Sequence, residues 1–216
     1  MKILDQKYQS KPLKPKQKLD GISARALSIH HDELYEGYIK KANEIHERLE
    51  TLQKQVVDGS VSGNATYSEL RSLKQAETYA VNGVYLHEWY FEGLRGTNGN
   101  SGVTRSSAPA LLAAIEEHFS SVEEFIKIFS ECAKCARGWT ILAWDTKAHR
   151  LMIYNGDAHN QGGIWGAIPI IVLDVYEHAY FIDFGADRGA YIESYWKNFD
   201  WKAANDTFTK VRSINL

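Results

Sequence analysis

Apolar residues recur every three or four positions through the first half of the chain, a spacing typical of amphipathic helices. One helix is predicted to begin after Ser23, a plausible N-cap, and to end near the turn-forming segment 58–64. A second is predicted from about Thr66, with Glu69 completing a capping box, to Gly93. Two long helices with a short joint predict an antiparallel hairpin. The stripe of the first helix comprises Leu27, His30 or His31, Leu34, Tyr38, Ala42, Ile45, Leu49 and Leu52.

The pattern changes after a joint rich in glycine, serine and asparagine at residues 93–109. Helices are predicted over 108–119 and 121–136, the second with Ser121 and Glu124 placed as a capping box. Strand-like runs follow at 139–144, 150–155 and 168–174, of which the first two form a predicted hairpin and the third is more deeply buried. Aromatic residues at helical spacing close the chain, from about residue 188 to 211.

These elements predict an α+β fold. Residues 1–103 form an N-terminal domain, the antiparallel long-helix hairpin. Residues 104–216 form a C-terminal α/β domain with a small three-stranded antiparallel sheet flanked by helices.

Composition narrows the function classes. The 216 residues include 25 basic and 27 acidic side chains, so no overall field recruits nucleic acid or a membrane surface. The first 21 residues lack an apolar signal segment, and no run of eighteen apolar residues occurs, which predicts a cytoplasmic protein. Cys132 and Cys135 are interpreted as small buried thiols rather than as a redox or metal-binding pair.

Ligand-type side chains follow the third predicted strand. The apolar run 168–173 ends in Asp174, and Glu177 and His178 come next. A carboxylate at the edge of an apolar interior is costly unless positive charge neutralises it, and a transition metal held also by imidazoles would do so. The alternative is an aspartate that caps the next helix beside a surface histidine.

Each helix of the hairpin offers a further histidine. His30 lies one turn before Leu34 and two before Tyr38, so we expect all three to face the core. Taken singly, such histidines are more typical of a core than of a ligand set. Together with Asp174 and His178, however, three imidazoles and one carboxylate suit iron or manganese better than a structural zinc. The second histidine is His87, whose neighbours include Val84, Leu86, Trp89, Tyr90 and Phe91.

These motifs resemble those of the iron/manganese superoxide dismutase family. The family signature reads Asp, any residue, Trp or Phe, Glu, His, a small residue and two aromatics, and this chain has DVYEHAYF, with a departure at Tyr176. The segments IHHDELYEGYIKKAN, VNGVYLHEWYF, GWTIL and ADRGAYIESYW are similar to the family's first helix, second helix, first strand and closing helix. The resemblance implies an enzyme that converts superoxide to dioxygen and hydrogen peroxide at one iron or manganese ion per subunit. The implied ligands are His30, His87, Asp174 and His178.

The resemblance also assigns residues around the ion. Tyr38 matches the active-site tyrosine, and Trp139 matches the cavity tryptophan, which is expected to wall the site together with Trp89, Tyr90 and Phe91. The hydrogen-bond partner of the metal's solvent ligand is usually a glutamine from one of two positions. Here one position is Gly83 and the other is His159, with Gln161 as a second possible register. The choice between iron and manganese stays open.

Further matches concern the entrance and the dimer. Arg188 matches the funnel arginine, and Glu177 matches the residue that reaches the metal-ligating histidine of the other subunit, so a homodimer or a dimer of dimers is implied. Leu34 and Phe181 replace a histidine and tyrosine that pair between subunits in many members. Because both are replaced, no polar group is orphaned. Glu33 replaces a lysine, which should weaken the steering of superoxide.

Two other functions are weighed against this one. A non-haem iron oxygenase would use two histidines and one carboxylate, whereas this chain offers four protein ligands. A catalytically idle relative that stores metal or binds a partner is the other alternative. The remaining histidines are interpreted as solvated or loop residues: His31, His46, His118 and His149.

Overall fold

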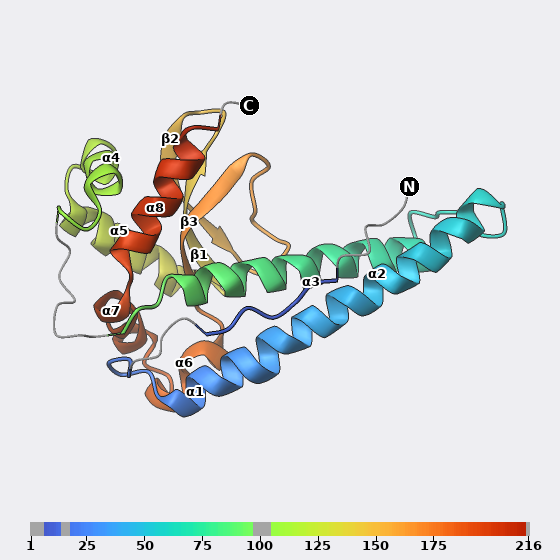
Figure 1. The fold of residues 1–216 in the computed structure, drawn as a ribbon, viewed down its shortest axis with the longest axis horizontal. Helices are drawn as coiled ribbons and strands as arrows, with labels where there is room; N and C mark the ends of the chain where they lie inside the picture. The colour runs from blue at the N-terminus through green and yellow to red at the C-terminus, as the bar shows by residue number, and fades with distance from the viewer. Residues whose placement is uncertain (1–6, 14–17, 97–104, 215–216) are drawn as a thin grey trace.

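The predicted helical hairpin is present in the computed structural model, which describes residues 7–13, 18–96 and 105–214. Helix α1 (Ala24–Ser28), the π-helical turn η1 (Ile29–Tyr35) and α2 (Glu36–Val57) follow one another without a break, and α3 (Glu69–Glu92) runs back beside α2 (Figure 1). The apolar stripe of α2 is buried, as the periodicity predicts. Its buried members are Ile39, Ala42, Ile45, Leu49 and Leu52.

The two N-caps of the hairpin illustrate how far local sequence determines a helix start. Ser23 caps α1 as predicted, since its Oγ accepts from the Ala26 N–H at 3.1 Å. The predicted start of the second helix at Thr66 is wrong. The Thr66 N–H is bound by Asn64 Oδ1 at 2.8 Å in a local turn, so the cap falls on Ser68, whose Oγ accepts from the Arg71 N–H.

The turn η1 departs from the regular helix that the spacing predicts. A π-helical turn is wider than an α-helical one, so neighbours that an α-helix would place on different faces can both be buried. Here His30, His31 and Tyr35 are all buried, whereas Leu34 is only half-buried. The expectation that Leu34 faces the core is therefore wrong, and Tyr35 takes that place. Tyr38 is half-buried and packs against the core.

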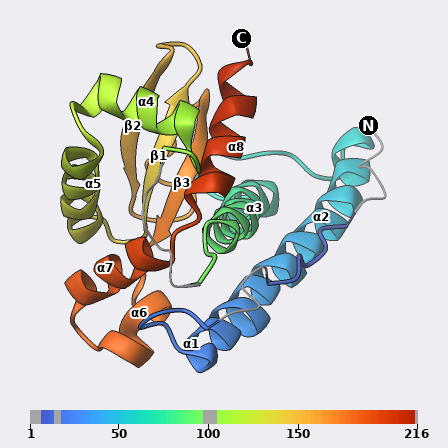
Figure 2. The ribbon, with the colours of Figure 1, turned by 60° about the vertical axis from the view of Figure 1, so that its left-hand side comes forward.

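The C-terminal half has the predicted helices and strands, except that the closing helical run is divided at Phe199 and Asp200 into two helices. Helices α4 (Pro109–Phe119) and α5 (Val122–Cys135) precede strands β1 (Trp139–Asp145), β2 (Arg150–Gly156) and β3 (Ala167–Asp174), and α6 (Glu177–Phe184), α7 (Arg188–Asn198) and α8 (Trp201–Arg212) complete it. The strand order is β2-β1-β3, with both neighbouring pairs antiparallel. Helices α4, α5 and α8 pack around the sheet, and α3 lies beside β3 (Figure 2).

The strand β3 lies at an edge of the sheet and carries both a proline and a bulge. Pro169 pairs with Ala143 where the register between β1 and β3 shifts, which is where a residue without an N–H is tolerated. Beyond the shift, the register brings Asp174 opposite Trp139. The end of β3 is thereby aligned with the start of β1.

The two halves are tied together near the start of α1. The Ser23 N–H donates to Asp183 Oδ2 at 2.7 Å, and Asp20 exchanges hydrogen bonds with the Asn198 amide. The predicted domain boundary at residues 103 and 104 lies outside the described residues. Within the described ranges, no helix combines the length and apolar character that crossing a bilayer requires.

Candidate metal centre

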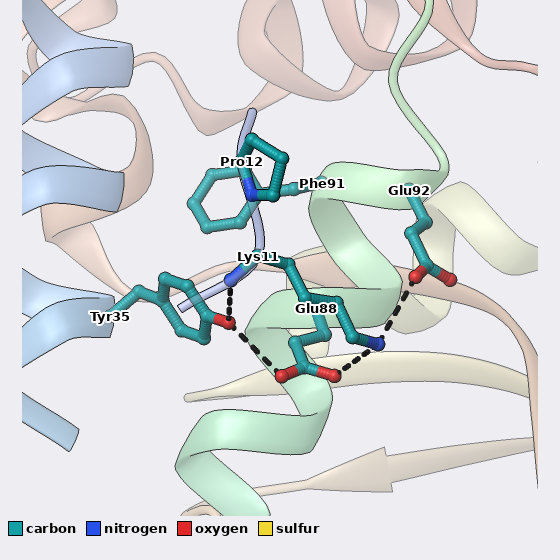
Figure 3. Close-up of a pocket in the computed structure, with 6 residues that line it drawn as sticks. All are labelled: Lys11, Pro12, Tyr35, Glu88, Phe91 and Glu92. Atoms are coloured by element: carbon teal, nitrogen blue, oxygen red, sulfur yellow. Dashed lines mark hydrogen bonds and ion pairs between the residues drawn. The ribbon is translucent and has the colours of Figure 1, made fainter. Parts of the chain in front are cut away.

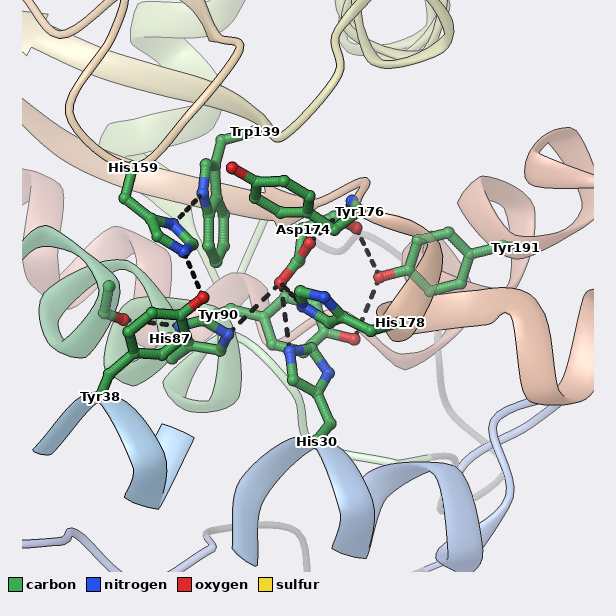
Figure 4. A network of polar contacts seen from close by, with 11 residues as sticks. His30, Tyr38, His87, Tyr90, Trp139, His159, Asp174, Tyr176, His178 and Tyr191 are labelled. Carbon is green, nitrogen blue, oxygen red and sulfur yellow. Dashed lines mark hydrogen bonds and ion pairs between the residues drawn. The ribbon is translucent and has the colours of Figure 1, made fainter. Parts of the chain in front are cut away.

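Four side chains from four elements converge at the junction of the two halves. His30 comes from η1, His87 from α3, Asp174 from the end of β3 and His178 from the first turn of α6 (Figure 4). One ligand atom from each lies within 4.8 Å of the others. Among the described residues this is the one such group of three or more histidine, cysteine or acidic side chains. The sequence-predicted ligand set is thus brought together.

Asp174 occupies the middle of the group. Its Oδ2 lies 3.1 Å from His30 Nε2, 3.2 Å from His178 Nε2 and 3.6 Å from His87 Nε2. Its backbone carbonyl accepts from the Tyr191 hydroxyl at 2.8 Å, and Oδ1 accepts from the Tyr176 N–H at 2.9 Å. These bonds leave Oδ2 aimed at the imidazoles.

His87 has a defined tautomer. Its Nδ1 lies 2.6 Å from the Gly83 carbonyl, which can only accept, so the ring proton is on Nδ1 and Nε2 carries a lone pair. This Nε2 is completely buried and has no hydrogen-bond partner among the residues that the structure describes. Burial, reinforced by the neighbouring His30, lowers the pKa of His87 to about 3. The side chain is therefore a neutral imidazole with an unused donor atom.

The pKa values of Asp174, His30 and His178 depend on two opposing effects: burial, and the attraction between the carboxylate and the imidazoles. Burial alone would raise the pKa of Asp174, but His178 and His30 attract and hydrogen-bond the carboxylate and bring the pKa below its ordinary value. Burial lowers the pKa of His30, and Asp174 only partly offsets it. For His178, burial also lowers the pKa, but the attraction of Asp174 exceeds this effect and the net shift is upward. A buried carboxylate thus faces imidazole nitrogens, an arrangement that a shared cation satisfies.

Comparisons with known proteins identify the family. Residues 107–207 match the family described as "Iron/manganese superoxide dismutases, C-terminal domain". The iron superoxide dismutase of Aquifex pyrophilus is 40% identical over 199 residues, covering 92% of this chain and 89% of that protein. The corresponding enzyme of Aquifex aeolicus is 39% identical with the same coverage. The manganese superoxide dismutase of Haloarcula marismortui is 32% identical over 88% of this chain and 86% of its own length.

The chain belongs to the iron/manganese superoxide dismutase family. The match extends across both the hairpin and the C-terminal half, because relatives cover about nine-tenths of the chain and the family model lies within the second half.

A directed chain of hydrogen bonds runs beside the four donors. The Trp139 indole N–H donates to His159 Nδ1 at 2.9 Å, so the proton of His159 is on Nε2. His159 Nε2 then donates to the Tyr38 hydroxyl oxygen at 2.7 Å (Figure 4). Burial lowers the pKa of His159 to about 4, which keeps this imidazole neutral. The alternative register at Gln161 is not favoured, since Gln161 is exposed in a turn with Ala158.

Gly83 is required by the packing of Tyr38. A Cβ at Gly83 would lie 2.7 Å from Tyr38 Cδ1, so any side chain there would displace the phenol ring. The space beside Gly83, where the family resemblance allows a glutamine, is therefore occupied in this chain by the Tyr38 ring.

Aromatic side chains wall the group, with one exception to the prediction. The rings of Tyr90 and Phe91 lie 5.1 and 5.0 Å from the ring of His30, and the ring of Trp139 lies 5.1 Å from that of His87. Trp89 packs against Tyr85 instead, with ring centroids 6.3 Å apart. The wall of the site therefore includes Tyr35, which the sequence did not single out and whose ring stacks 6.3 Å from His87.

His31 was predicted to be solvated, and this is wrong. It is buried, and its ring nitrogens lie 2.8 Å from the Lys11 carbonyl and 2.7 Å from Asp32 Oδ1. The segment 7–13 thus packs against η1 and α3. The Lys11 N–H donates to the Tyr35 hydroxyl, and the Lys11 ammonium pairs with Glu88 at 2.5 Å (Figure 3). In the sequence, the burial of His31 is signalled only by its position next to His30, where the apolar stripe of the first helix begins.

The other predicted surface histidines and thiols have mixed outcomes. His118 and His149 are exposed as predicted, whereas His46 is half-buried and lies 3.2 Å from Glu77. Cys135 is exposed and Cys132 half-buried, so the reading of both as buried thiols is wrong; Ala133 and Ala136 face the core instead.

The residues assigned to the entrance and the dimer lie on η1, α6 and α7. Arg188 begins α7, and its guanidinium donates to the carbonyls of Ala136 at 2.7 Å and Lys134 at 3.2 Å. Glu177 is exposed at the start of α6, one residue before His178. Phe181, on the next turn, is 55% exposed. Glu33 is exposed and Leu34 is half-buried on η1.

Proposed function

We propose that this chain is a superoxide dismutase that holds one iron or manganese ion through His30, His87, Asp174 and His178. The observation that carries the proposal is the convergence of three imidazole nitrogens on one buried carboxylate oxygen. Superoxide dismutation is the activity in the names of the relatives in both the iron and the manganese groups. Nothing in the donor set or the comparisons favours the idle relative or the oxygenase.

The residues present fit such an ion. His87 Nε2 is a buried lone pair that no N–H or O–H reaches within the described part of the chain. Nitrogen donors with a single carboxylate suit iron and manganese, whereas structural zinc sites prefer thiolates. When bound, the ion supplies one-electron redox chemistry, because iron and manganese each have two accessible oxidation states.

The chain's own residues account for the other requirements of the reaction. Two superoxide anions and two protons give dioxygen and hydrogen peroxide, so protons must be held near the site. We propose that His159 and Tyr38 hold them: the Nε2–H of His159 is committed to the Tyr38 oxygen, which leaves the Tyr38 hydroxyl proton free to be donated. Trp139, Tyr90 and Phe91 limit the access of bulk water.

Replacing His87 by Ala tests the assignment. We expect His87→Ala to lose both bound metal, measured by elemental analysis, and superoxide turnover, because the ion would retain three protein ligands beside a new cavity. The exposed His118 is the matched control, and His118→Ala should retain both. Turnover that persists in the metal-free His87→Ala protein would contradict the proposal.

We further propose that the functional unit is a homodimer, alone or paired into a dimer of dimers. Glu177 is exposed beside His178 and makes no ion pair within the described part of the chain, and Phe181 and Ile182 expose apolar surface on the same helix. A second subunit would cover these side chains. Sedimentation equilibrium of the native protein tests the proposal, and a monomer at all concentrations would contradict it.

The domain division and the location stay predictions. We propose that residues 1–103 and 104–216 are two domains, each of which supplies two of the four donors, so that neither half expressed alone should bind the ion with the native affinity. Cell fractionation tests the cytoplasmic location.

A further inference from the structure

Tyr79 lies where the hydrogen-bonded chain beside the donors meets solvent. It belongs to α3, about two turns before His87. Its ring centroid lies 4.5 Å from that of His159 and 6.2 Å from that of Tyr38. Tyr79 is 37% exposed, whereas His159 is only 4% exposed. Tyr79 is therefore more exposed to water than either the half-buried Tyr38 or His159.

Hydrogen bonds between the neighbours of His159 and Tyr79 in the chain fix the contact between these two side chains. The residue after His159, Asn160, donates from its amide to Thr78 Oγ1 at 3.0 Å and to the Gln75 carbonyl at 3.4 Å. Thr78 immediately precedes Tyr79 in α3. The loop that carries His159 is thus fastened to the helical turn that carries Tyr79, so their proximity is built into the fold.

The directions of these hydrogen bonds assign no acceptor to the hydroxyl proton of Tyr38. Trp139 donates to His159, and His159 donates to Tyr38, so the Tyr38 oxygen already accepts one hydrogen bond and its own proton points elsewhere. The Tyr79 ring centroid lies 6.2 Å from that of Tyr38 and 4.5 Å from that of His159, so Tyr79 is the phenol on α3 next to this pair.

The two side chains assigned to the entrance, Leu34 and Phe181, are apolar and can neither donate nor accept a proton. A third phenol, Tyr176, has its ring 5.2 Å from that of His159, but it follows β3 and stacks against His178. Tyr79 is the exposed hydroxyl beside the Tyr38 and His159 pair on the α3 side.

We propose that Tyr79 relays protons from solvent to the Tyr38 and His159 pair. As Tyr38 gives its proton inward, the Tyr79 hydroxyl gives its proton to the Tyr38 oxygen and takes one from water. Each phenol ends with the proton count it began with, and one proton has moved from solvent toward the site. The role in turnover rests on the proposed dismutase function, but the connection to solvent does not.

The His159 Nε2 proton is hydrogen-bonded to the Tyr38 oxygen, so its exchange with water through that oxygen tests the relay. The full chain is loaded with zinc, which is diamagnetic, its histidines are labelled with nitrogen-15, and the exchange rate is measured by NMR. We expect Tyr79→Phe to slow this exchange by roughly tenfold or more, because a positioned proton-transfer group contributes orders of magnitude. Tyr85→Phe is the matched control, since Tyr85 is on the same helix, 40% exposed, and directs its hydroxyl to Tyr8.

Turnover supplies the second measurement. In the iron- or manganese-loaded protein, Tyr79→Phe should lower kcat and leave kcat/KM little changed, and small proton donors added to the buffer should restore kcat. Exchange in Tyr79→Phe within twofold of the native rate, or equal slowing in Tyr85→Phe, would overturn the proposal. If the native loaded protein fails to consume superoxide, the proposed function fails, whereas the exchange measurement still decides the role of Tyr79.

Discussion

Gly83 shows how a single backbone position sets two neighbours of the candidate ion. Its carbonyl fixes the tautomer of His87, and its missing side chain makes room for the ring of Tyr38. The same residue therefore links a ligand with the residue that holds a proton beside it. A substitution at Gly83 should disturb Tyr38 without removing the ligand His87, because the backbone carbonyl is retained.

Replacing Gly83 by Ala should displace Tyr38. The added Cβ would lie 2.7 Å from Tyr38 Cδ1 inside a packed region, so we expect a loss of about 1–3 kcal/mol in the free energy of unfolding. Turnover should fall while metal content is retained. Denaturant unfolding and elemental analysis measure both effects.

Gly37 provides the control for that substitution. It is also helical, but a Cβ there meets nothing within 4 Å. Gly37→Ala should therefore leave turnover unchanged and stabilise the protein by up to about 1 kcal/mol, the difference in helix propensity. Equal destabilisation by both substitutions would contradict the role given to Gly83.

Single residues divide into those the sequence could identify and those it could not. The four donors, Tyr38 and His159 were predicted because order and spacing along the chain matched a family motif. Tyr79 was not predicted, because its importance arises from a loop contact 80 residues away in the chain, through Asn160 and Thr78. No local pattern reports such a contact.

At the scale of elements, the periodicity predicted the helices and strands but missed η1. A π-helical turn keeps apolar residues at nearly helical spacing, so the pattern of the sequence does not distinguish it from a regular helix. Its consequence is that Tyr35 and His31 are buried and contact the segment 7–13. This segment forms an outer layer that covers η1 and α3.

Removing the Glu88 carboxylate should loosen this outer layer. Glu88 pairs with the Lys11 ammonium and accepts from the Tyr35 hydroxyl at 3.0 Å, and its side chain is only 14% exposed. We expect Glu88→Ala to cost about 1–3 kcal/mol in the free energy of unfolding, because two polar groups lose a partner. Thermal or urea unfolding measures the change.

Glu92 is the control for Glu88. It lies one turn further along α3 and 3.3 Å from the same ammonium, but its side chain is 51% exposed. Glu92→Ala should cost less than about 1 kcal/mol, as for exposed ion pairs. If the two substitutions had equal effects, burial of the pair would not be what stabilises the segment 7–13.

At the scale of the whole molecule, the candidate site joins two halves that are separate in sequence. His30 and His87 come from the hairpin, and Asp174 and His178 come from the C-terminal half. The fold class was predictable because each half has its own periodicity. The meeting of the halves was predictable only through the family motif, since periodicity carries no information about which faces pack together.

Removing the ion should lower the stability of the whole chain. A ligand that binds only the folded state at about a thousand times its Kd adds ~4 kcal/mol, so we expect Tm to fall by roughly 10 °C on chelation. Differential scanning calorimetry measures the shift, and adding iron or manganese back should reverse it. His87→Ala should show no comparable response to either treatment.

One redox-active ion is proposed to lie between the four donors. Anomalous X-ray diffraction from crystals of the native protein, recorded on both sides of the iron and manganese absorption edges, locates such an ion. We expect a single strong peak per chain, for one of the two metals, bounded by His30, His87, Asp174 and His178. Electron density that shows these side chains with no anomalous scatterer between them, or a peak elsewhere in the chain, would contradict this proposal.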